Sequence, residues 1–144
     1  GLGIFDAYTV HWIAGKSDHI RGLSSAARGR FVGNIVVQWG KETLVGFENH
    51  GGRTHLNPGT QPLGRVLVGH GNNGRDGSEG AICKNAIGTY LHGPILPKNP
   101  HLTDFLIQVA LSRRYGAVEL KPLDDGLEWE AHRQAVSRAK ALGR

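Results

Sequence analysis

The sequence predicts an α/β fold in which short antiparallel strands are followed by two helices. A β-rich run, Phe31–Trp39, is separated by Gly40-Lys41 from a second extended run, Thr43–Glu48, which is the pattern of a hairpin. Beyond Asn99, apolar side chains recur at helical spacing. No βαβ unit is complete, so the pattern is typical of half of a doubly wound α/β domain.

Shorter extended segments complete the predicted β structure. Three of them are expected at Tyr8–Ile13, Arg53–Leu56 and Arg65–Val68. A second hairpin pairs Ala81–Cys83 with Ala86–Leu91 across Lys84-Asn85, and the asparagine takes the positive φ. The strands are therefore short and mostly joined by tight turns.

Capping signals predict where the two helices begin and end. Asn99 is a suitable N-cap, Pro100 suits the first helical position, and Gly116 is a natural stop. The second helix is expected over Leu127–Leu142, with one of the two preceding aspartates as its cap. Its apolar residues are mostly alanine, which indicates that the helix either packs lightly or docks against something else.

Composition limits the class of protein. With 144 residues, of which 39% are hydrophobic and 20% charged, the chain is expected to form one globular domain over residues 1–144. The net charge is +5, but the basic residues are scattered, so no nucleic-acid partner is expected. No run of 18 apolar residues exists, so no membrane span is expected, and no leader is visible, which favours the cytoplasm.

Several polar residues are expected to have no chemical role. The glycine-rich segment Gly69–Gly80 is predicted to be a surface loop in which Asp76 and Glu79 are solvated. Cys83 is expected to be a small buried apolar residue, and no spacing of histidines or cysteine predicts a metal site. Six histidines are expected to be solvated or locally bonded: His11, His19, His55, His70, His101 and His132.

The segment Gly88–Pro94 carries the strongest functional signal. It places His92 just after a β-patterned run, beside glycines and a proline. A histidine at a strand end is held firmly and can face a cleft, which suits a general base. No obvious nucleophile accompanies it in these residues.

Two other segments have both a functional and an ordinary interpretation. Arg30 precedes the strongest β run, so its planar guanidinium either grips a carboxylate or is a solvated loop charge. The turn that contains Asn49, His50 and Gly51 either presents backbone N–H groups to a ligand or simply ends a hairpin. The residues alone leave both alternatives open.

Three segments together resemble the cobyric-acid-synthase-like (CobB/CobQ-type) class I glutamine amidotransferases. They are Gly46–Thr54, Gly69–Asn73 and Gly88–Asn99, and the resemblance extends from Gly1 to about Asp104. It implies the C-terminal part of a flavodoxin-like amidotransferase domain. Within this family the chain is most similar to small glutaminase subunits that serve the amidation of lipid II.

The resemblance implies roles for four residues. His92 matches the family's catalytic histidine, which activates a cysteine thiolate for glutamine hydrolysis. Arg30 matches the arginine that grips glutamine, and Asn49 and Gly51 match the loop that holds the substrate. The ammonia would pass to a Mur-ligase-like synthetase, the other half of a heterodimer, which amidates the D-glutamate of membrane-bound lipid II in peptidoglycan synthesis. ATP and a metal are expected on that partner, and no cofactor on this chain.

The chain departs from the family pattern in two ways. The family's nucleophilic cysteine lies on a Cys-Gly-Gly elbow upstream of the region that matches Gly1, so this partial domain is expected to be inactive alone. Many relatives have a glutamate two residues after the histidine, where this chain has Pro94. The acid that orients the histidine then comes from elsewhere, such as the synthetase, or the site works as a dyad.

Two other functions stay as alternatives to the amidation of lipid II. One is a corrinoid amidotransferase, and the other is a non-catalytic module that binds a synthetase.

Overall fold

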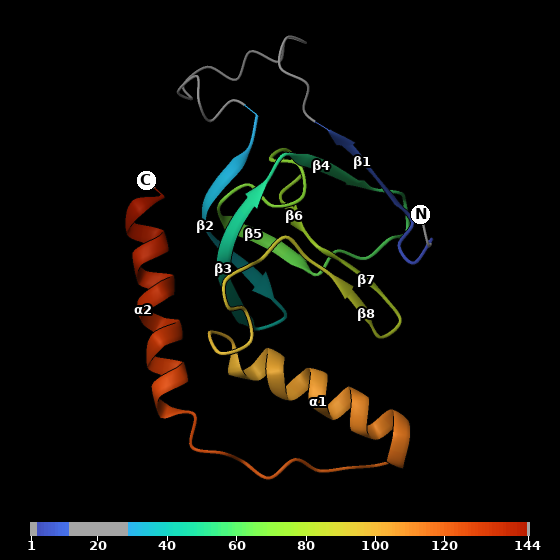
Figure 1. Cartoon of the computed structure of the whole chain (residues 1–144), viewed down its shortest axis with the longest axis vertical. Helices are drawn as coiled ribbons and strands as arrows, with labels where there is room; N and C mark the ends of the chain where they lie inside the picture. Colours follow the sequence, from blue (N-terminus) through green and yellow to red (C-terminus); the bar gives the residue numbers. More distant parts are fainter. Residues whose placement is uncertain (1–2, 12–28, 144) are drawn as a thin grey trace.

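The computed structural model describes residues 3–11 and 29–143 of the chain. Within these ranges the fold consists of short strands followed by two helices (Figure 1). In chain order, the elements are β1 Ala7–His11, β2 Phe31–Trp39, β3 Glu42–His50, β4 Gly52–Leu56, β5 Gly64–Val68, β6 Ser78–Glu79, β7 Ala81–Cys83, β8 Ala86–Gly88, α1 Pro100–Tyr115 and α2 Gly126–Leu142.

The hairpin of β2 and β3 is the longest pairing in the structure. It runs without a break from Phe31 opposite His50 to Trp39 opposite Glu42, and Gly40 turns the chain with a φ of 59°. The main sheet has the order β3-β2-β5-β6, while β1 pairs with β4 and β7 with β8. All of these pairings are antiparallel, which confirms the prediction.

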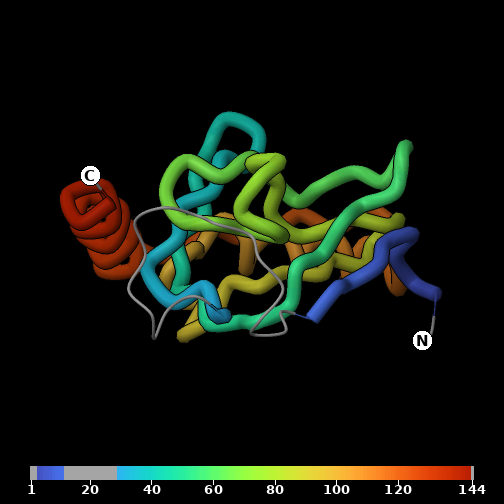
Figure 2. Tube along the Cα trace, turned by 90° about the horizontal axis from the view of Figure 1, so that it is seen from above, coloured from blue at the N-terminus to red at the C-terminus, as the bar shows by residue number. Residues whose placement is uncertain are grey.

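Side chains that are adjacent along β2 and β3 belong to two separate hydrophobic cores, because successive side chains of a strand point to opposite faces of the sheet. The core on the α1 side contains Ile35, Val37, Leu44, Leu63, Leu91 and Leu102. The core on the α2 side is smaller and contains Val36, Val45 and Ala139. Figure 2 shows α2 end-on at one side of the strands, and its small alanine face agrees with the expected light packing.

The helix limits agree with the sequence, but the first cap works differently. Asn99 is the N-cap of α1, Pro100 is its first residue, and Gly116 follows its end with a φ of 82°. The Asn99 side chain does not cap the helix. It accepts a hydrogen bond from the Val45 backbone N–H at 2.8 Å and donates to the Val45 and Ile95 carbonyl oxygens at 2.9 and 2.7 Å. Asn99 therefore ties the start of α1 to β3.

Two local predictions need correction, and a third extends beyond the described residues. In the β7–β8 turn the positive φ, 55°, belongs to Lys84 and not to Asn85. β8 ends at Gly88, three residues before the predicted end of that strand, because the chain there turns away to meet β3 at His92. The last two residues of the predicted strand Tyr8–Ile13 lie outside the described residues.

In the part of the chain that the structure describes, neither helix is long and apolar enough to cross a membrane.

We expect Asn99→Ala to lower the free energy of unfolding by about 2–3 kcal/mol, because it leaves the buried N–H and C=O groups of Val45 unpaired. Urea denaturation of the variant checks this, with Asn34→Ala as the control, since Asn34 is an exposed asparagine of β2. Equal urea midpoints for Asn99→Ala and Asn34→Ala would show that Asn99 does not stabilise the contact between α1 and β3.

Candidate active site

Arg30 and Asn49 form a forked contact at one end of the β2–β3 hairpin. Arg30 immediately precedes β2, and Asn49 is the penultimate residue of β3. The guanidinium Nε and Nη2 donate to Asn49 Oδ1 at 3.1 and 2.8 Å, and Nη2 also donates to the Asn49 carbonyl oxygen at 2.9 Å. A guanidinium has five N–H donors, so Arg30 can hold Asn49 and still donate to a ligand through Nη1.

His92 is positioned by its backbone. Its N–H donates to the Phe47 carbonyl oxygen at 2.8 Å, and the Phe47 N–H donates to the His92 carbonyl oxygen at 3.1 Å. This isolated antiparallel bridge attaches His92 to the free edge of β3. The imidazole is exposed, so it is available to a ligand.

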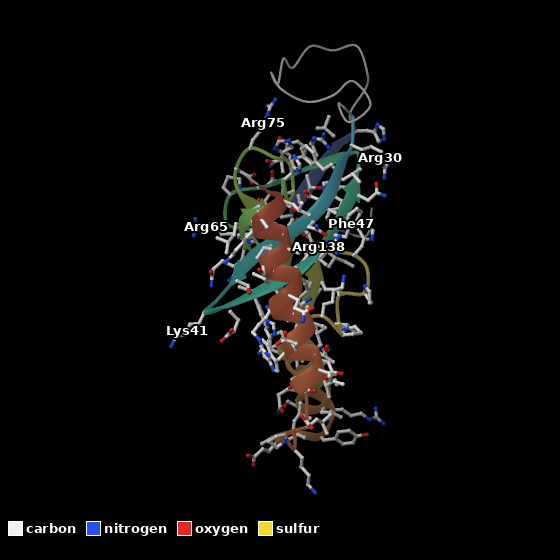
Figure 3. All side chains as sticks on the ribbon, turned by 90° about the vertical axis from the view of Figure 1, so that its left-hand side faces the viewer. Arg30, Lys41, Phe47, Arg65, Arg75 and Arg138 are labelled. Carbon is white, nitrogen blue, oxygen red and sulfur yellow. The ribbon has the colours of Figure 1, made fainter. Side chains whose placement is uncertain are left out.

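Strand geometry places these groups on one face. Phe47 and Asn49 are exposed, whereas Glu48 and His50, which alternate with them, are buried. Residues directly opposite in an antiparallel pair project from the same side, so the His92 side chain shares the face of Phe47. In Figure 3, Arg30 and Phe47 lie to the right of α2, while Arg65 and Arg75 lie to its left.

Gly51 lies beside this face but is not required there for steric reasons. A Cβ on Gly51 would meet the Gly29 carbonyl oxygen at 3.5 Å and Arg30 Cγ at 3.8 Å, which are ordinary contacts. The structure thus brings together Arg30, Asn49 and Gly51, with His92 on the same face of β3.

Glu48 is the main residue of this region that sequence reasoning missed. Its side chain is fully buried and accepts hydrogen bonds from the His70 backbone N–H at 2.9 Å, the Gly71 N–H at 3.0 Å and His70 Nδ1 at 2.7 Å. Because a carboxylate only accepts, His70 Nδ1 carries a proton. Burial raises the pKa of Glu48, but the nearby His50 imidazole, whose Nε2 lies 3.9 Å from Glu48 Oε2, and the hydrogen bonds from His70 and Gly71 outweigh it and lower the pKa to about 2.

Stacked rings support the same end of the hairpin from its buried side. His50 stacks on Tyr90 with ring centroids 3.6 Å apart, and Phe31 meets His50 edge-on at 5.5 Å. Phe31 also stacks on His70 at 4.2 Å, and the Arg53 guanidinium lies 3.5 Å from the Phe31 ring centroid. His70, predicted to have ordinary surroundings, is therefore part of the support for Glu48.

The predicted surface loop Gly69–Gly80 is partly buried, at residues 71–73 and 79–80, and exposed at residues 74–76. Glu79 is fully buried, accepts hydrogen bonds from the Thr89 hydroxyl at 2.8 Å and the Tyr90 N–H at 2.7 Å, and burial raises its pKa. The prediction that Glu79 is solvated is therefore wrong, because the glycines let the loop fold back against the strands. Asp76 is exposed as predicted, although it accepts a hydrogen bond from the Asn73 side chain.

Two other features lie apart from the four predicted site residues. A cavity of about 610 Å³ is lined partly by Thr9, Thr54 and Tyr90, whose hydroxyls are bonded in a chain at 2.8 Å, and none of the four lines it. Cys83 is half-buried at the end of β7, which pairs with β8 and not with β3. Among the described residues, no group of three or more His, Cys, Asp or Glu side chains could hold a metal ion.

The alternation of β3 contained a signal for Glu48. Leu44 belongs to the buried face, and residues two and four positions further along share its side of the strand. A carboxylate at an inward position needs a partner, because burying it unpaired is costly. The partners, His70 and Gly71, lie 22 and 23 residues away in sequence, so only the folded chain identifies them.

The chain belongs to the CobB/CobQ-like glutamine amidotransferase family, whose model matches residues 1–100. It is 43% identical over 140 residues to the lipid II isoglutaminyl synthase (glutamine-hydrolyzing) subunit GatD of Staphylococcus aureus, which covers 96% of this chain and 51% of that protein. The subunit of the same name from Streptococcus pneumoniae is 38% identical, covering 90% of this chain and 46% of that protein. A probable cobyric acid synthase of Methanothermobacter thermautotrophicus is 38% identical over 94 residues, which cover 65% of this chain and 17% of that protein.

The chain thus spans about half the length of the GatD relatives. The family agrees with the α/β fold of antiparallel strands and two helices that the sequence predicted.

The pKa of Glu48 leads to a prediction about stability. The folded pKa of about 2 lies below the ordinary 4.5, so the stabilisation is complete above pH 4.5 and is lost as the pH falls toward 2. Between about pH 6 and pH 3 the loss of unfolding free energy contributed by Glu48 is about 2 kcal/mol. Glu79 has the opposite effect on the free energy of unfolding. Because its pKa is raised, acidification favours the folded state through this group.

Comparing Glu48→Gln with the unsubstituted protein isolates the Glu48 contribution. Urea denaturation at both pH values should show a gap in unfolding free energy that narrows by about 2 kcal/mol on acidification. A gap that does not change with pH would contradict the assigned charge of Glu48.

Proposed function

We propose that this chain supplies the histidine and the glutamine-binding part of a glutamine amidotransferase. The observation that carries the proposal is the placement of the Arg30–Asn49 fork and His92 on one exposed face of β3. Membership of the amidotransferase family supports it. The reaction is the hydrolysis of glutamine to glutamate and ammonia.

Each residue has a chemical task in this proposal. The Arg30 guanidinium holds the α-carboxylate of glutamine, and Asn49 keeps the guanidinium fork oriented through its carbonyl oxygens. A cysteine outside these 144 residues attacks the side-chain amide, which gives a thioester and releases ammonia. His92 takes the thiol proton and returns one to the leaving nitrogen, and water then hydrolyses the thioester to glutamate.

The ammonia acceptor is the second element of the proposal. We infer that a Mur-ligase-like synthetase partner uses the ammonia to amidate the D-glutamate of lipid II in the cytoplasm. The support is that the two lipid II isoglutaminyl synthase subunits match at least 90% of the chain. Cobyric acid synthases of three organisms match 65% of the chain, so a corrinoid acceptor is the weaker alternative. ATP and a metal are proposed to belong to the partner, with no cofactor on this chain.

We expect His92→Ala to lower glutamine hydrolysis at least about 10³-fold in the native protein with its synthetase, because no general base then remains for the thiol. Ammonia release measures this, and the melting temperature should be unchanged because His92 is held by its backbone. His55→Ala is the matched control, since His55 lies on β4 and stacks on Tyr8. Activity that survives His92→Ala would refute the assignment and favour a non-catalytic module.

We expect Arg30→Ala to raise the KM for glutamine about 10- to 100-fold with a smaller change in kcat, because a charge-assisted pair contributes about 1.5–3 kcal/mol. Steady-state kinetics with Arg30→Lys alongside separates charge from geometry, since lysine keeps the charge and loses the fork. A KM equal to that of the unsubstituted protein would remove Arg30 from the substrate site.

A further inference from the structure

Phe47 is an exposed aromatic residue placed between the two ends of the proposed site. Its side chain is 38% exposed, and α2 does not cover it, because that helix packs on Val36 and Val45 further down the hairpin. Its neighbours on the same face include Asn49 and Val45, each two residues away along β3, Asn34, directly opposite on β2, and His92, directly across the bridge. A large aromatic ring is therefore exposed beside Asn49 and His92, where a ligand can reach it (Figure 3).

The spacing along this face matches the length of glutamine. Residues two apart in a strand are separated by about 7 Å, and a pair that exchanges both backbone hydrogen bonds has its Cα atoms about 5.5 Å apart. Phe47 and His92 are such a pair. From its α-carboxyl carbon to its amide carbon, an extended glutamine spans about 5 Å. A glutamine held by Arg30 beside Asn49 can therefore cross Phe47 and bring its amide near His92.

The chemistry of Phe47 suits the middle of that ligand. Glutamine has a charged amino acid group at one end, an amide at the other, and two methylene groups between them. The ends call for polar partners, which Arg30, Asn49 and His92 provide, while the methylenes gain only from apolar contact. On the segment between Asn49 and the His92 bridge, Phe47 is the side chain that offers it.

We propose that Phe47 is a glutamine-binding residue whose ring packs against the two methylene groups of the substrate. The inference rests on the proposed glutaminase function and adds a specificity element to it. Asparagine has one methylene fewer, so with its carboxylate held by Arg30 its amide falls short of His92. Phe47 and the fork together then select a side chain of glutamine length.

The test is steady-state glutamine hydrolysis by the native protein with its synthetase, carrying Phe47→Ala or Phe47→Tyr. Burial of one methylene group raises the affinity about fourfold, and the Phe47 ring would cover one side of the two methylene groups of glutamine. Phe47→Ala should raise the KM about fourfold with kcat within twofold, whereas Phe47→Tyr keeps the ring and should give a KM below that of Phe47→Ala. Leu67→Ala is the matched control, because Leu67 lies on β5 and is 37% exposed.

A binding measurement keeps the proposal testable without turnover. Calorimetric titration of glutamine into His92→Ala, with and without Phe47→Ala, should show the Kd rising by the same factor of about four. An unchanged Kd and KM would overturn the proposal, and so would a fall in kcat at constant KM, which would instead link Phe47 to the alignment of His92. Absence of glutamine hydrolysis in the unsubstituted complex would refute the glutaminase function itself, which is a separate outcome.

Discussion

The buried carboxylate of Glu48 is the interaction on which the proposed site depends most. A buried charge is costly unless it is paired, and Glu48 is paired by two backbone N–H groups and the His70 imidazole. These bonds hold the end of β3 against the loop that begins at Gly69. A slip of one residue in the β2–β3 register would move Glu48 to the open face and Asn49 into the interior. The hydrogen bonds of Glu48 therefore also determine which side chains lie on the face of the proposed site.

A second constraint acts on His92 through the backbone that follows it. Lys98 Nζ donates to the Gly93 carbonyl oxygen at 2.8 Å, and His132 Nδ1 donates to the Lys98 carbonyl oxygen at 2.8 Å. The other ring nitrogen of His132 is bonded to the Thr43 hydroxyl at 3.1 Å. α2 is therefore joined both to β3 and to the segment after His92. The helix lies beyond the part of the chain that the family model matches, yet it braces the site.

Much of the fold could be predicted from the sequence because its signals are local. The β2–β3 hairpin follows from two β-rich runs around Gly40, and α1 follows from Asn99, Pro100 and Gly116. The failed prediction for Glu79 concerns a residue whose partners are distant in the sequence. Glu79 looked solvated among glycines, but its partners are Thr89 and Tyr90 on a later segment.

The sequence by itself determined most of the strands, the helix limits and the residues that resemble an amidotransferase site. Hydrophobic periodicity and capping residues act within a few positions, so they can be read along the chain. Only the tertiary structure decided that Arg30 grips Asn49, that His92 is paired with Phe47, and that Glu48 is buried. The physical reason is that these contacts join segments 19 to 45 residues apart, and their geometry depends on strand register and on how the interior satisfies its polar groups.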